Sequence, residues 1–416
     1  MIDFCSQEAK PLLLVEEAIE KILMAIQEVT DYEVVELRAG LGRVLAENVY
    51  AIVDSPYDKN SAMDGYAFSS IDIDNQQDFS LTKVGTSWAG RPYHGQLTKG
   101  QCIRIFTGAV VPSELDSVIM QEHVTENAGQ VLFPAATKAF QNIRNAGEDI
   151  AVNSLVLDAK KTLSAMDLGL LASVGVEKVA VKRQVKVAFF STGDELRALG
   201  QPLVSGQIYD SNRYTLYGLL MEAQYSVTDM GVLADDPALL EASFIKAAQN
   251  YDVIITTGGA SVGDADYIKE ILTRCGSVNF WKLAIKPGKP LAFGKIGECH
   301  FFGLPGNPVA VVVTFQYLVL PALKKLAGAA LSKKLQITAK CMSVLKKAAG
   351  RQEYLRGVLA QDDNGEFFVT SAGKQGSHIL RSMSQANCYI VLPVSCEGVN
   401  EGEKVRVDLM PGADII

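Results

Sequence analysis

The sequence lacks an excess of basic residues. Its 416 residues include 39 lysines and arginines against 47 aspartates and glutamates, so the formal net charge is 39 − 47 = −8. Proteins that bind nucleic acid or an anionic membrane surface need a cationic face that displaces counterions. The composition therefore argues against nucleic-acid and membrane partners. Taken alone, it also disfavours a small anionic substrate.

A secretory signal and a long apolar run are missing as well. Residues 1–10 contain two acids, Asp3 and Glu8, and no apolar core behind a basic start. The most apolar stretch, Pro308 to Leu323, is too short and too polar at one edge for a bilayer span. We therefore expect a buried helix over this stretch and a cytoplasmic protein.

Metal-binding patterns of cysteine and histidine are absent from the sequence. The 7 cysteines are odd in number, scattered and never spaced as C-x-x-C, and the 4 histidines show no paired spacing. Structural zinc sites draw their ligands from such short spacings. We therefore expect no zinc site, and we interpret the cysteines as reduced thiols.

The pattern of apolar and turn residues divides the chain into three regions. The first, residues 1–183, opens with an amphipathic helix at 15–29. From about 52 to 143 it contains short alternating strands separated by glycine and proline. A helical pattern returns at 164–173. We predict a mixed N-terminal domain with an inserted β-rich lobe.

The second and third regions have different architectures. Residues 184–330 alternate strands with helices, which is typical of a doubly wound α/β domain. The near-continuous apolar strand at 252–257 indicates a sheet covered by helices on both faces. Residues 331–416 contain short strands at intervals of about ten residues, and Asn364-Gly365 favours a hairpin turn. This last region predicts a small β-barrel or sandwich.

Polar residues follow the first strand of the α/β region. Thr192 and Gly193 form a turn that leads to the acids Asp194 and Glu195. Two acids in such a turn either cap a helix start or supply oxygen ligands to Mg²⁺. Ligands of open α/β sheets bind beyond the carboxyl ends of the strands, which is where these residues lie.

A second cluster follows the strand at 252–257. Gly258 and Gly259 let backbone N–H groups approach a bound anion. A hydroxyl and two carboxylates come next, on Ser261, Asp264 and Asp266. The combination favours a phosphate-and-metal site over a plain turn.

The segment from Trp281 to Lys295 contains four lysines and no acid. Read as one strand, it places Lys282, Ala284 and Lys286 on one side. Lys286 then enters a Pro-Gly-Lys-Pro turn, in which the prolines restrict the backbone that presents Lys289. A solvated charged face is the alternative, but the rigid turn favours anion binding. This local concentration of charge removes the objection to an anionic substrate.

Further candidate positions are weaker when each is taken alone. Gly306 and Asn307 enter a helix whose N-terminus is a potential anion site, or a plain strand–turn–helix connection. In the first region, Asp64, Thr107 and Asp149 lie in turns that could be ordinary turn chemistry. In the third region, a cation and a hydroxyl lie at strand edges, on Arg356 and Ser377.

Together, the sequence motifs that contain these residues closely resemble those of the molybdopterin molybdenumtransferase family, the MoeA proteins, and their relative the gephyrin E domain. The resemblance covers nearly the whole chain in family order. The matching strings are S-A-M-D-G-Y at Ser61, I-R-I-F-T-G-A at Ile103, N-I-R at Asn142, G-E-D at Gly147, S-T-G-D-E-L at Ser191, G-Q-I-Y-D-S-N at Gly206, G-G-A-S-V-G-D-A-D-Y at Gly258, K-P-G-K-P at Lys286 and G-L-P-G-N-P at Gly303.

The resemblance implies a fold and an activity. The central region would be a molybdopterin-binding domain like the MoaB and MogA proteins, and the C-terminal region a small β-barrel. The activity would be the last step of molybdenum cofactor assembly, in which molybdenum from molybdate joins adenylylated molybdopterin and AMP leaves, with Mg²⁺ required. The family's subunits form a homodimer, in which the active cleft lies between the α/β domain of one subunit and the N-terminal region of the other.

The resemblance also assigns roles to residues. Those at the catalytic positions are Asp64, Thr107, Asp149, Glu195, Asp235 and Asp266, and three of them, Glu195, Asp235 and Asp266, would hold the metal. Residues that bind adenylylated molybdopterin would be Thr192, Gly193, Gly258, Gly259, Ser261, Lys282, Gly306 and Asn307. Residues that bind molybdate would be Lys286, Lys289, Pro290, Arg356 and Ser377. One departure affects the molybdate pocket, because many relatives have a serine at the position of Ala310.

Two alternative functions stay open at this stage. The sister molybdopterin adenylyltransferase shares the α/β domain, but it normally lacks the Ser61 string and the C-terminal barrel. A non-enzymatic scaffold, as gephyrin also is, would use additional domains and linkers. Expected partners are the upstream adenylyltransferase and downstream cofactor-modifying enzymes.

Overall fold

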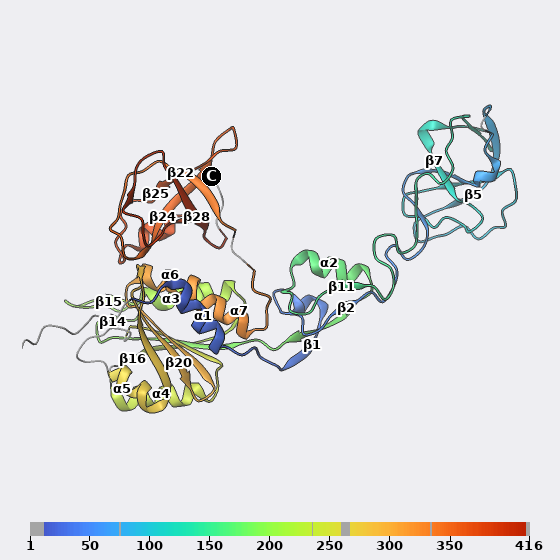
Figure 1. The fold of residues 1–416 in the computed structure, drawn as a ribbon. Coiled ribbons are helices and arrows are strands. Elements are labelled where there is room, and N and C mark those ends of the chain that lie inside the picture. The colour runs from blue at the N-terminus through green and yellow to red at the C-terminus, as the bar shows by residue number, and fades with distance from the viewer. Residues whose placement is uncertain (1–11, 75, 235, 259–266, 333–334, 413–416) are drawn as a thin grey trace, which may run out of the picture. The chain divides into compact units, whose positions relative to one another are not determined.

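The computed structural model describes residues 12–74, 76–234, 236–258, 267–332 and 335–412. The chain forms two compact units (Figure 1). One contains residues 34–41 and 45–181, and the other contains residues 1–33, 42–44 and 182–416. The N-terminal helix α1 (Val15–Ala25) thus belongs to the unit that contains the α/β sheet.

A six-stranded sheet organises the α/β part. Its order is β16-β13-β17-β21-β20-β18; the first four strands are parallel, and β20 and β18 are antiparallel to their neighbours. The predicted doubly wound arrangement is confirmed. In chain order the strands are β13 (Lys186–Thr192), β16 (Ser226–Leu233), β17 (Val253–Thr257), β18 (Ser277–Lys282), β20 (Pro290–Ile296) and β21 (Cys299–Leu304).

Helices cover both faces of this sheet because successive strand residues point to opposite sides. Phe189 packs in the core beneath α1, while its neighbour Phe190 packs in the core on the other face. In Figure 1, α4 and α5 lie on one face and α1, α3, α6 and α7 on the other. The bounds of the helices not yet given are α3 (Ser211–Glu222), α4 (Pro237–Ala248), α5 (Tyr267–Cys275), α6 (Pro308–Thr314) and α7 (Leu320–Leu326).

The apolar helix predicted from Pro308 is part of the core. The helix extends to Leu326, beyond the predicted end at Leu323, so the prediction that it is too short to cross a membrane is wrong. However, 72% of its 18-residue apolar window is buried inside the fold, as a buried helix requires. A π-helical segment, Phe315–Val319, joins α6 to α7. Within it, Tyr317 donates a hydrogen bond to Asp408 of the C-terminal domain, at 2.8 Å. The helix therefore packs against both the sheet and the barrel.

The C-terminal strands close into a five-stranded barrel. The order β24-β25-β22-β28-β26 returns to β24, so the predicted barrel is confirmed. Asn364-Gly365 lies in the β24–β25 hairpin, where Gly365 has a φ of 83°. The strands are β22 (Ile337–Cys341), β24 (Gln352–Gln361), β25 (Phe367–Ser371), β26 (Cys388–Leu392) and β28 (Lys404–Leu409), with the helix α8 (Leu380–Gln385).

The other unit contains the expected β-rich lobe. Its six-stranded sheet has the order β7-β4-β6-β5-β9-β8, with apolar clusters on both faces. A smaller part contains α2 (Ala165–Ser173), whose N-terminus is capped by Ser164. The strands of the lobe are β4 (Gly65–Phe68), β5 (Phe79–Ser87), β6 (Gln101–Ile105), β7 (Ser117–Met120), β8 (Thr125–Asn127) and β9 (Gln130–Phe133), and short strand pairs join β1 (Tyr32–Glu36) to β12 (Lys178–Lys182), β2 (Val49–Tyr50) to β11 (Leu155–Leu157) and β3 (Asn60–Ser61) to β10 (Ile143–Arg144).

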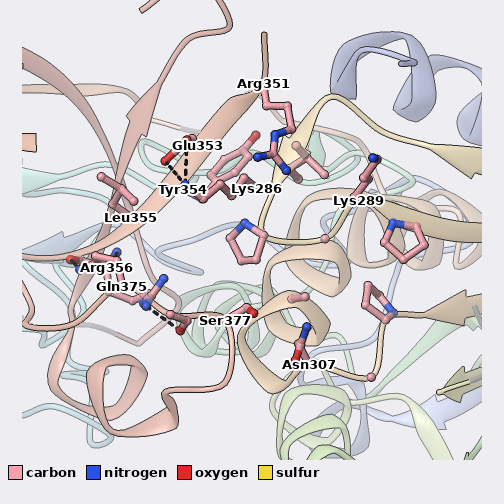
Figure 2. A pocket seen from close by; sticks show the side chains of 18 of the residues that line it. Lys286, Lys289, Asn307, Arg351, Glu353, Tyr354, Leu355, Arg356, Gln375 and Ser377 are labelled. Atoms are coloured by element: carbon pink, nitrogen blue, oxygen red, sulfur yellow. Dashed lines mark hydrogen bonds and ion pairs between the residues drawn. The ribbon is translucent and has the colours of Figure 1, made fainter. Parts of the chain in front are cut away.

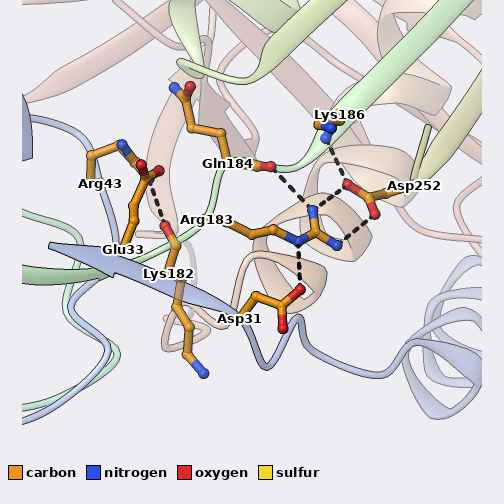
Figure 3. A network of polar contacts seen from close by, with 8 residues as sticks. All are labelled: Asp31, Glu33, Arg43, Lys182, Arg183, Gln184, Lys186 and Asp252. Carbon is orange, nitrogen blue, oxygen red and sulfur yellow. Dashed lines mark hydrogen bonds and ion pairs between the residues drawn. The ribbon is translucent and has the colours of Figure 1, made fainter. Parts of the chain in front are cut away.

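A polar network fixes the chain where it enters the α/β sheet (Figure 3). Both terminal nitrogens of Arg183 donate to the Asp252 carboxylate, at 2.7 and 2.8 Å, and the backbone N–H of Lys186 donates to it at 2.8 Å. Burial raises the pKa of Asp252, but the hydrogen bonds from Arg183 and Lys186 outweigh it, so the pKa lies below its usual value of 3.8.

Asp252→Asn is expected to lower the free energy of unfolding at pH 7 by about 2 kcal/mol, because it removes a bidentate, charge-assisted contact. Since the folded state has the lower pKa, the contribution is present at neutral pH and is lost as the pH falls below 3.8. Urea unfolding from pH 7 to pH 3 tests this. The control is Asp31→Asn, because Asp31 is exposed and meets Arg183 at only 3.4 Å. Equal losses in the two variants would contradict the prediction.

Candidate functional site

A cavity of about 1170 Å³ lies where the α/β sheet meets the barrel, within one compact unit (Figure 2). Residues from both domains line it. The sequence-predicted residues that it brings together are Glu195, Gly258, Lys282, Lys286, Lys289, Pro290, Gly306, Asn307, Arg356 and Ser377. Ala310 lines it too. Ten predicted positions from separate segments thus share one cavity.

The lysine segment reaches this cavity by crossing from the sheet to the barrel. It was expected to be one strand, but β18 ends at Lys282, and β19 (Ile285–Lys286) pairs with barrel strand β24. Ala284 is 2% exposed rather than sharing the open side of the lysines. Only Ala284 departs from the predicted alternation, because the backbone changes sheets at Leu283 and Ala284. Leu283 and Ile285 are buried and Lys282 and Lys286 are exposed, as predicted.

Lys286 forms an ion pair within the cavity. Its ammonium donates to both carboxylate oxygens of Glu353, at 3.1 and 3.2 Å. The two residues are direct partners in the parallel β19–β24 register. The Lys286 side chain is 47% exposed and that of Glu353 is 4% exposed. The carboxylate therefore lies behind the ammonium, which remains accessible from the cavity.

Arg356 is a fully buried cation on β24. Its guanidinium donates to the Ser382 hydroxyl at 3.1 Å and to the carbonyls of Lys374 and Gly376 at 3.2 and 3.1 Å. Burial lowers its pKa, and Tyr389 acts in the opposite direction. No carboxylate of the described residues pairs with it. A buried cation without a counter-ion favours an incoming anion.

The start of the helix at Pro308 forms another part of the wall. Asn307 occupies the N-cap position, but its side chain makes no capping hydrogen bond. The Val309 N–H donates to the Ser377 carbonyl at 3.1 Å, which ties the helix to the barrel. Asn212 donates to the Gly306 carbonyl at 2.8 Å and fixes the preceding turn.

The strand-end turns bring Thr192, Gly193, Glu195 and Gly258 together. At Gly193, with a φ of 144°, a Cβ atom would lie 2.5 Å from Glu195 Oε2, so the glycine leaves room for this carboxylate. At Gly258, with a φ of 86°, a Cβ would lie 2.6 Å from the Thr192 carbonyl oxygen. Thr192 is buried and does not line the cavity. It supports the turn that carries Glu195.

Three predicted catalytic residues lie in the other unit. The Thr107 N–H and hydroxyl both donate to Asp64 Oδ1 at 2.8 Å. These bonds lower the pKa of Asp64 below its usual value. Asp149 has no such contact with the pair, and its backbone N–H donates to the Ser55 carbonyl. The structure thus brings Asp64 and Thr107 together.

Several predicted residues lie outside the part of the chain that the structure describes. They are Asp235, Gly259, Ser261, Asp264 and Asp266. Of the three proposed metal ligands, only Glu195 is therefore described. No group of three or more potential metal ligands occurs among the described residues. Glu195 supplies carboxylate oxygens, which suit a hard cation such as Mg²⁺.

Comparisons with known families cover almost the whole chain. Residues 13–175 match the MoeA N-terminal region (domains I and II), and residues 188–325 match a probable molybdopterin binding domain. Residues 338–410 match the MoeA C-terminal region (domain IV). A molybdopterin molybdenumtransferase from Haemophilus influenzae is 43% identical over 95% of this chain and 98% of its own length. The chain belongs to the molybdopterin molybdenumtransferase family.

Other members of the molybdopterin molybdenumtransferase family agree with this assignment. The one from Nostoc is 36% identical over 92% of this chain and 89% of its own length. The crystal structure of the molybdopterin biosynthesis MoeA protein from Pyrococcus horikoshii has a TM-score of 0.82 and 30% identity, covering 96% of this chain and all of its own. Gephyrin from Dictyostelium discoideum is 32% identical, over 95% of this chain and 62% of its own length.

Sequence reasoning missed six charged or polar cavity residues, namely Lys346, Arg351, Glu353, Tyr354, Ser371 and Gln375. Gln375 exchanges hydrogen bonds with the Arg356 backbone, at 2.8 and 2.9 Å. Glu353 lies three residues before Arg356 on the same strand, β24. No sequence signal marked Glu353, because its pairing with Lys286 joins two segments that are distant in the sequence.

Gly258→Ala is expected to lower the free energy of unfolding by about 2 kcal/mol, because the new Cβ would meet the Thr192 carbonyl and the positive φ disfavours alanine. The matched control is Gly218→Ala. Gly218 lies within α3 with open space around its Cβ position, so this variant should gain up to about 1 kcal/mol. Denaturant unfolding of both variants tests the prediction. A neutral Gly258→Ala would contradict the close packing of the two turns.

Proposed function

We propose that this protein transfers molybdenum from molybdate to adenylylated molybdopterin and releases AMP, as the final step of molybdenum cofactor biosynthesis. The observation that carries the proposal is the charge of the cavity. Six cations and two carboxylates line it, 6 − 2 = +4 among the described residues, in a chain with a net charge of −8. Such a site suits a substrate that bears phosphates together with an oxyanion.

The cationic wall would hold molybdate. Lys286 and Lys289 are accessible lysines, and Arg356 is a buried planar donor without a carboxylate partner. Pro290 and Ser377 complete the wall. Tetrahedral oxyanions are bound by such combinations of ammonium, guanidinium and hydroxyl donors. Ala310 offers no hydroxyl here, so the hydrogen bonds to the anion would come from these other groups.

The strand-end turns and the helix start would hold the adenylylated pterin. Lys282, Gly258, Gly306 and Asn307 line the same cavity. Gly259, Ser261 and the metal ligands Asp235 and Asp266 come from the family resemblance. Mg²⁺ bound by Glu195 and those two aspartates would neutralise charge on the pyrophosphate between AMP and the pterin. Glu195 itself would hold and orient that cation.

We also propose a cytoplasmic homodimer. The family resemblance supports a cleft to which one subunit contributes its α/β domain and the other contributes Asp64, Thr107 and Asp149. The hydrogen-bonded Asp64–Thr107 pair is already organised within its own unit. The substrates fix the class of its neighbours in the pathway: an adenylyltransferase must supply the adduct, and enzymes that modify or insert the cofactor must consume the product.

Glu195→Gln is expected to slow AMP release at least about 100-fold while ligand affinity survives, because the amide keeps the shape but loses the charge that holds the cation. The assay incubates the protein with adenylylated molybdopterin, with and without molybdate, and measures AMP. The control is Asp194→Asn, since Asp194 is also exposed but does not line the cavity. Undiminished turnover of Glu195→Gln would contradict the metal assignment.

The same assay separates the proposed function from the two alternatives. Molybdate-stimulated AMP release from the wild-type protein is the expected result. Formation of the adenylyl adduct from ATP would instead identify the sister adenylyltransferase. Inactivity in both assays would favour a scaffold.

A shared cleft predicts complementation between inactive subunits. Asp64→Asn and Glu195→Gln should each be inactive alone. After the two proteins are mixed under conditions that exchange subunits, half of the dimers are heterodimers with one intact site, so about a quarter of wild-type activity should return. Exchange is followed by native mass spectrometry. If heterodimers form without activity, both residues act in the same subunit's site.

A further inference from the structure

Glu353 has a position in the cavity that the roles above do not explain. It is 3% exposed and lies on β24, three residues before Arg356. The polar partner of its carboxylate among the described residues is Lys286. We infer that Glu353 is the resident counter-ion of the molybdate site and sets how tightly the site holds a dianion. This inference rests on the proposed function.

The geometry makes Glu353 compete with an incoming anion for the ammonium of Lys286. The carboxylate of Glu353 is nearly buried, whereas the ammonium of Lys286 is half-exposed, and Figure 2 shows the two contacts between them. An anion that reaches Lys286 therefore shares the ammonium with Glu353. Arg356 differs, because it has no carboxylate partner among the described residues.

The negative charge of Glu353 determines how much binding free energy the anion loses. Repulsion between Glu353 and a bound anion is proportional to the charge of the anion. Glu353 thus weakens the binding of a dianion twice as much, in free energy, as that of a monoanion of the same shape. In the proposed reaction molybdate must leave this site to react with the dithiolene of the pterin. Weaker binding favours that transfer, because Lys286 and Arg356 together would otherwise retain molybdate.

The test replaces Glu353 by glutamine and measures the binding of two tetrahedral anions by equilibrium dialysis without the pterin substrate. Molybdate carries two negative charges and perrhenate carries one. Glu353→Gln should tighten molybdate binding about tenfold and perrhenate binding about threefold, so that the logarithms of the two changes stand near two to one. A purely structural role would not produce this ratio.

Two controls accompany this measurement. Glu366→Gln makes the same chemical change at an exposed position of the same barrel, outside the cavity, and should leave both affinities unchanged. Thermal unfolding of Glu353→Gln checks that the barrel remains folded. Weaker or unchanged molybdate binding by folded Glu353→Gln, or equal changes for the two anions, would overturn the inference.

A double variant provides a second, independent test. Lys286→Met removes the ammonium and leaves Glu353 buried without its partner, so it should weaken molybdate binding strongly. Removing the carboxylate as well, in Lys286→Met with Glu353→Gln, should restore at least about tenfold of that loss. If the double variant binds molybdate as poorly as Lys286→Met, Glu353 does not oppose the anion.

The outcomes distinguish this inference from the proposed function. If the wild-type protein binds neither anion, the molybdate site itself is wrong and both proposals fail. If the wild-type protein binds molybdate and releases AMP in response to it, but Glu353→Gln lacks the charge-dependent change, only the role of Glu353 fails.

Discussion

The parallel pairing of β19 with β24 is the contact on which the rest of the cavity depends. It places Lys286 opposite Glu353 and so joins the lysine segment of the α/β domain to the barrel strand that carries Arg356. Because the chain leaves the sheet after Lys282 and buries Leu283 and Ala284, the lysines on either side remain exposed. One change of strand partner thus creates a cationic surface within an acidic protein.

Burial divides the cations of the cavity into two kinds. Arg356 is held by neutral acceptors, a hydroxyl and two carbonyls, so its positive charge is not cancelled within the described structure. Lys286 is accessible but paired with a buried carboxylate. Desolvating a charge is costly unless a partner compensates it. The cavity therefore combines a buried guanidinium, whose charge no carboxylate of the described residues cancels, with an exposed ammonium, whose charge Glu353 partly cancels.

The unit that contains residues 34–41 and 45–181 holds two of the predicted catalytic residues, Asp64 and Thr107, in contact. The Asp64–Thr107 hydrogen bonds hold a carboxylate at the end of a strand, and the positive φ of Gly108 allows the turn that follows Thr107. The chain returns from this unit at Lys182, and the Arg183–Asp252 contact fixes the returning segment to the start of β17. Hydrogen bonds within the unit therefore hold Asp64 and Thr107 together.

Sequence periodicity determined the element types and much of their extent, because a helix or strand of the core must repeat its apolar residues at its own spacing. The helix predicted at 164–173 and the apolar strand predicted at 252–257 formed as α2 (Ala165–Ser173) and β17 (Val253–Thr257). The motifs also identified the residues of one cavity, since strand-end turns converge at one sheet edge. The tertiary structure alone decided the sheet switch at Leu283 and the pairing of Lys286 with Glu353. Both depend on contacts between segments about 70 residues apart, which no local pattern encodes.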